Sequence, residues 1–302
     1  NLVAGSSTYG AGGRVAITSG ESSGDVTGDV LINTAASDVA RSGAVVLETG
    51  SSGKNTGDVV IRTGESSQQA GGVTIAAGTS SGNSVGSLVR IRAGDASGRT
   101  GGLISIASGA GGPGTASGSI HIATADAGAV GDSGPVHLRT GAAVSGTSGP
   151  IELSTGDSSN GPVGSISLKV GTSNYTAGGN IALEAGDAVK NGSTGGSVTL
   201  KSGSGQASGG PVNIRGGNVS DSETGVGGAV LIQGGQSATG GSVLLESGSS
   251  LSQSSGTGSI KTGVANGTEK SGQITIVTGT TESSGSGSVV VQTGASAAGD
   301  IG

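Results

Sequence analysis

Gly57-Asp58-Val59-Val60-Ile61-Arg62-Thr63-Gly64 reads Gly-x-Val-x-Ile-x-Thr-Gly, and the rest of the 302-residue chain consists of copies of this stretch and the connections between them. We number each copy from its first large apolar residue, the anchor at position 0. Nineteen copies follow one another, usually 15 residues apart, and such a fixed period is typical of repeat architectures. Their anchors are Val15, Val30, Val45, Val59, Val73, Val89, Ile104, Ile120, Val136, Ile151, Ile166, Ile181, Val198, Val212, Val230, Val243, Ile260, Ile274 and Val289.

Side-chain character alternates within each copy. Position −2 is Gly except at Ser87, positions 0 and +2 are β-branched or Leu, and position +4 is small or β-branched. The single polar residue at +2 is Thr262, in the copy anchored at Ile260. Charged residues fall at +1 and +3, as Arg62 does. This alternation with a period of two predicts a strand with one buried face, and the Gly at +5 predicts its end.

The repeat predicts an all-β fold, a β-solenoid of about nineteen 15-residue repeats. We favour a flattened coil of two repeats, in which position 0 of one copy faces +2 of the next and −2 faces +4. A coil of one repeat is the alternative, although its second wall would contain residues such as Lys54 and Gln68. We expect one continuous domain over 1–302. Because both ends lie inside a repeat, we interpret the chain as an uncapped segment of a longer repetitive protein.

Composition narrows the function classes. Gly accounts for 67 residues, there is no Cys, Met, Trp or Phe, and the net charge is −6. A broad nucleic-acid surface needs positive charge, a disulfide scaffold needs Cys, and a membrane helix needs about 20 apolar residues in a row. The sequence therefore predicts no nucleic-acid partner and no membrane span.

The extended motif Gly-x-Val-x-Ile-x-Thr-Gly-x-Ser-Ser resembles the long Gly/Ser-rich repeat proteins of algae and related protists, and β-solenoid adhesins and fibre proteins in general. The resemblance covers the whole chain. It implies a structural protein at the cell surface or outside the cell.

Candidate chemistry is sparse, and we expect no enzyme and no cofactor. Acids at +6 occur in every second copy, which raises a calcium ladder as an alternative to a solvated edge, but the calcium-binding nonapeptide is missing. The only histidines, His121 and His137, both lie at +1 and are not expected to share a metal site. The acids are Glu65, Asp95, Asp126, Asp157 and Asp187.

Two sets of residues are candidates for modification or assembly. Four sequons lie in connections and are candidates for N-glycosylation in a secreted protein; their acceptors are Asn174, Asn191, Asn218 and Asn266. Six apolar residues at +1 point outward in the predicted strands and are candidate assembly contacts. They are Leu31, Val46, Val60, Leu231, Leu244 and Val290.

These features predict a segment of an extracellular fibre, filament, sheath or adhesive stalk that self-associates into a filament or lateral bundle. The alternative is a surface-binding module, adhesin-like or ice-binding, because a column of Thr occurs at +4.

Overall fold

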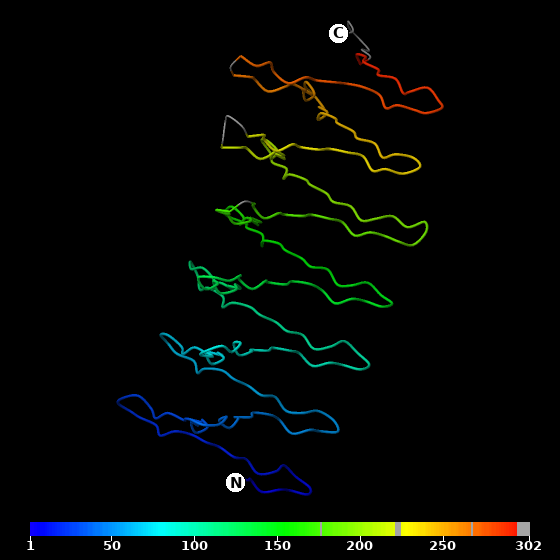
Figure 1. Ribbon diagram of the computed structural model, residues 1–302. Coiled ribbons are helices and arrows are strands. Elements are labelled where there is room, and N and C mark those ends of the chain that lie inside the picture. The colour runs from blue at the N-terminus through cyan, green and yellow to red at the C-terminus, as the bar shows by residue number, and fades with distance from the viewer. Residues whose placement is uncertain (176, 221–224, 267, 295–302) are drawn as a thin grey trace. The chain divides into compact units, whose positions relative to one another are not determined.

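The computed structural model describes residues 1–175, 177–220, 225–266 and 268–294, in two units, Asn1–Ile151 and Glu152–Gly302. Within each unit the chain runs out along one copy, turns, and returns along the next (Figure 1). Each copy is thus placed opposite its successor. The described residues contain no helix and no strand.

The prediction of an all-β solenoid is therefore wrong. Extended copies are present, but a strand requires a ladder of hydrogen bonds to a neighbour. The backbone hydrogen bonds found in the described residues join consecutive copies at single points or close short turns. The chain is an irregular coil in which single hydrogen bonds join some of the consecutive copies.

The recurrent contact is a neck where one copy ends and the next begins. The amide of the Gly at −2 donates to the carbonyl of the Gly at +5 in the preceding copy, as Gly28 does to Gly20 at 3.2 Å and Gly102 to Gly94 at 2.9 Å. The connection between the two copies becomes a loop closed at its base. The donors of this kind in the described residues are Gly13, Gly28, Gly102, Gly118, Gly196, Gly210, Gly228, Gly241 and Gly256.

Position +4 is the most closely packed part of the neck. A Cβ atom at Gly102, position −2, would lie 3.1 Å from Ala93 Cβ at +4 of the preceding copy, closer than side chains normally pack, so Gly allows the approach. The predicted meeting of −2 with +4 is present. The partly covered residues of the described chain lie at this position, once Thr262 is assigned to +4 by the register correction given below. These residues are Ala4, Ser19, Thr34, Ala93, Ala185, Ser202, Gly216, Gly234, Thr262 and Thr278.

The predicted core at positions 0 and +2 is not present. Apart from Ile260, large side chains at position 0 are 48–62 % exposed, those at +2 are more so, and none is buried in the described residues. The accessible surface is 30055 Å², against about 11,000 Å² for a folded monomer of this mass and about 40,000 Å² for an extended one.

The reason is an energetic imbalance within a copy. Each copy has only two large apolar side chains to bury. Ordering its backbone is costly, because Gly loses more conformational freedom than any other residue. A pair of copies closed at one neck cannot cover its own apolar residues.

The structure also corrects the register of one copy. Gly256, two residues before the expected −2 position of the Ile260 copy, donates to Gly248 at 2.8 Å, and Thr262 lies against Gly272. The copy is therefore Gly256-Thr257-Gly258-Ser259-Ile260-Lys261-Thr262-Gly263, with Ile260 at +2. Gly258 takes the place of the anchor. Ile260, at 78 % exposed, falls outside the range of true anchors.

Candidate functional site

The missing anchor at Gly258 leaves a notch between two consecutive copies. We call it the Gly258 notch. It has a cavity volume of about 460 Å³, within the size range of small-ligand pockets. Its lining comes from the copy of Val243 and the copy of Gly258. The lining residues are Leu245, Glu246, Ser247, Thr257, Gly258, Ser259 and Ile260.

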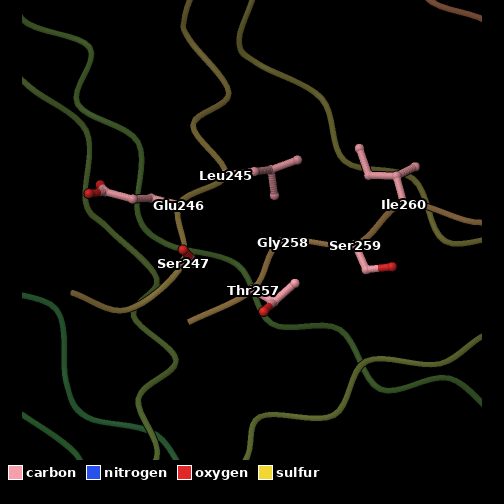
Figure 2. Close-up of a pocket in the computed structure, with 7 residues that line it drawn as sticks. All are labelled: Leu245, Glu246, Ser247, Thr257, Gly258, Ser259 and Ile260. Carbon is pink, nitrogen blue, oxygen red and sulfur yellow. The ribbon is translucent and has the colours of Figure 1, made fainter. Parts of the chain in front are cut away.

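Two aliphatic side chains flank the notch. Figure 2 shows Leu245 and Ile260 on either side of an open space over Gly258. A Cβ atom built at Gly258 would meet nothing within 4 Å. Leu245 lies at +2, the position expected to face an anchor, and it is 79 % exposed. Gly258 thus leaves this gap without the aliphatic side chain that the other copies have at position 0.

Polar groups surround this apolar gap. Ser247 and Thr257 lie below the gap, and Glu246 projects to the other side of the chain from Leu245 (Figure 2). The gap itself is thus lined by aliphatic and hydroxyl groups. They do not form a nucleophile with a neighbouring base, which covalent catalysis requires.

The titratable residues singled out in the sequence are not brought together. His137 lines a shallow hollow of about 260 Å³ with Arg139, and His121 does not contribute to it. Among the described residues no group of three His, Cys, Asp or Glu could hold a metal ion. Two of the acids at +6 lie beside a basic residue of their own copy: Asp95 pairs with Arg92, and Glu65 lines a hollow with Arg62.

The four candidate glycosylation sites are exposed at their asparagines, but two sequons extend outside the described residues, at positions 176 and 267. Among the four sites, the turn around Asn191 has the most clearly defined geometry. Ser193 N donates to Lys190 O at 3.0 Å, and Gly192 has φ of 77°, as a type II turn requires at its third residue. Asn191 therefore lies at the tip of a tight turn.

The six candidate assembly residues at +1 are all largely exposed. They differ in the residue two positions further on. Val60 is followed by Arg62, and Val46 by Glu48. Leu31, Leu231 and Val290 are followed by Asn or Gln, and Leu244 by Glu246 of the notch.

The notch was not found by sequence reasoning, although a signal was present. Thr262 was the single polar residue at +2, and Ala265 stood at +5 in place of Gly. Moving the anchor to Gly258 removes both exceptions. Gly258 is 15 residues from Val243 and 16 from Ile274, whereas Ile260 is 17 and 14 residues from them.

Comparison with known proteins places the chain in no family: no family model, no curated protein and no solved structure matches it. Among the described residues no helix has the length and apolar character that crossing a membrane requires.

Proposed function

We propose that this chain is a structural repeat protein of an extracellular or cell-surface assembly, such as a fibre, sheath or adhesive stalk, and that other copies cover its apolar positions. One observation carries the proposal. Aliphatic side chains recur at fixed intervals along the chain and are uncovered in the described residues. Extended apolar surface of this kind marks an interaction site.

Regularity favours a repetitive partner. The apolar positions 0 and +2 recur about every 15 residues, so a partner with the same spacing can contact many copies at once. A second copy of the chain has that spacing. Each contact contributes little, but many linked contacts bind far more tightly than one. A single small ligand would use only one of these positions.

The alternative of an ice-binding surface is not favoured by the geometry. Ice binding would need the Thr column at +4 to face outward. In the described copies Thr34 instead has its methyl group toward Gly43 of the next copy. Residues at +4 are also the least exposed of the chain.

Analytical ultracentrifugation over a wide range of protein concentrations tests the proposal. We expect the average mass to rise with concentration well above that of a 27.8 kDa chain. Because apolar burial drives the association, sulfate should strengthen it and urea should weaken it. A monomer at every concentration, with or without sulfate, would contradict the proposal.

Glycans at exposed connections would fit a secreted assembly. The turn at Asn191 leaves this residue exposed to solvent. Expression through a secretory pathway, followed by enzymatic deglycosylation and mass measurement, tests this. Asn191→Gln should remove the glycan at that position, and an unmodified Asn191 would contradict the assignment.

A further inference from the structure

We propose that Asn160 is a site of spontaneous modification, at which water converts the side-chain amide to a carboxylate through a cyclic imide. This modification goes beyond the proposed function, because it is a covalent change of a single chain and needs no partner. The structure also ranks two chemically equivalent sites, Asn160 and Asn191, by the turns in which they lie.

Three asparagines are followed directly by Gly: Asn160, Asn191 and Asn266. The following residue matters because its backbone nitrogen can attack the side-chain carbonyl of the Asn, and a Cβ on that residue hinders the approach. The pair at Asn266 extends outside the described residues, at position 267. Asn160 and Asn191 are exposed and lie in connections between copies, so water reaches both side chains.

The reaction balances without an oxidant, a reductant or a cofactor. The Gly161 nitrogen forms a bond to Asn160 Cγ and loses its proton to water, and the side-chain nitrogen takes up a proton and leaves as ammonia. Water then opens the cyclic imide at either carbonyl and produces Asp or isoaspartate. Within the described residues the Gly161 amide donates no backbone hydrogen bond, so its nitrogen is free to attack.

The turn at Asn191 holds the reacting groups apart. Both the amide and the hydroxyl of Ser193 donate to Lys190 O, and Gly192 has φ of 77°, so Asn191 is the second residue of a type II turn. In such a turn the second residue has ψ of about +120°. This angle directs the next amide nitrogen away from the Cβ of the Asn, so the ring cannot close until the turn opens.

The turn at Asn160 lacks this closure for a covalent reason. Pro162 has the place relative to Asn160 that Ser193 has relative to Asn191, and Pro has no N–H to donate. The chain bends at Asn160 with no backbone hydrogen bond across the bend in the described residues. Asn160 can therefore rotate about its Cα–C bond toward the geometry of the ring without breaking a hydrogen bond.

The product changes the connection between the copies of Ile151 and Ile166. A carboxylate at 160 adds a negative charge to a connection that already contains Asp157. An isoaspartate also lengthens the main chain by a CH₂ group. A glycan does not protect Asn160, because Asn160-Gly161-Pro162 is not a sequon. The connection therefore becomes more acidic as the protein ages.

Peptide mass spectrometry of the chain, produced without glycosylation and incubated in neutral buffer, tests this modification. We expect Asn160 to be converted to Asp and isoaspartate about fivefold faster than Asn191, the ratio that corresponds to one hydrogen bond. Asn55, an exposed Asn followed by Thr56, is the internal control and should stay largely unconverted. No conversion at Asn160, or conversion at Asn191 that is equally fast or faster, would overturn the inference.

Two substitutions separate the turn from the local sequence. Ser193→Pro removes the N–H that closes the Asn191 turn, and we expect Asn191 then to react as fast as Asn160. Gly161→Ala places a Cβ 3.6 Å from Ser158 Oγ, an ordinary contact, and should slow conversion of Asn160 severalfold. If Asn191 stays slow in Ser193→Pro, the turn does not control the reaction and the ranking is rejected. If Gly161→Ala leaves the rate at Asn160 unchanged, the cyclic route is rejected.

Discussion

Filling the Gly258 notch from within the chain should stabilise the neck beside it. Gly258→Val restores the anchor that the other copies have. Val243, a true anchor in the preceding copy, is 51 % exposed. We therefore expect about half of a Val side chain at position 258 to be covered. Full burial of Val stabilises by about 1.5–3 kcal/mol, which gives roughly 1 kcal/mol here. Val also has less backbone freedom than Gly when the neck is open, and this adds about 0.5 kcal/mol to the stabilisation.

Hydrogen exchange of the Gly256 amide measures this effect locally. That amide donates to Gly248 O at 2.8 Å and exchanges when the neck opens. A stabilisation of about 1.4 kcal/mol slows exchange tenfold, so we expect roughly tenfold slower exchange at Gly256. Exchange at the Gly241 neck should not change.

Two control substitutions distinguish apolar contact from a general effect of removing Gly. Gly258→Ser reduces backbone freedom but adds no aliphatic group, and we expect only a slight slowing of exchange at Gly256. Gly285→Val adds the same side chain at another position where a Cβ meets nothing within 4 Å. If Gly258→Val leaves exchange at Gly256 unchanged, or accelerates it, the notch is not the place of a missing anchor.

Three further predictions concern the backbone. At the preceding neck, Gly234→Ala would put a Cβ against Gly241 O and should remove the protection of the Gly241 amide from exchange. A Cβ at Gly235 has open space, so Gly235→Ala should leave that protection unchanged. Gly114 has φ of 78°, so Gly114→Ala should cost about 1 kcal/mol and speed exchange of the Thr115 amide roughly fivefold; an unchanged rate would contradict this turn geometry. Far-ultraviolet circular dichroism of the dilute chain should show neither helix nor strand bands, and strong strand bands would contradict the irregular coil.

The repeat and its spacing are properties of the sequence alone. Gly at −2 and +5, and small residues at +4, follow from the copies without any coordinates, and they lie where consecutive copies meet. At −2, a Cβ on Gly13 or Gly228 would lie 2.9 Å from the amide nitrogen of the Gly at +5 of the preceding copy, so Gly at −2 carries information about where two backbones approach. The chemistry of the chain is likewise limited by composition, since it has no Cys and two His.

Only the tertiary structure decided whether the alternating pattern becomes a sheet. Alternation indicates which face of an extended segment can be covered, but it does not supply the cover. In the described residues Val243 and Leu245 stay exposed, because one closing hydrogen bond per neck does not bring a further layer against them. The register of the Gly258 copy was decided in the same way. An apolar Ile260 satisfies the pattern at 0 or at +2, and the contact of Gly256 with Gly248 selects +2.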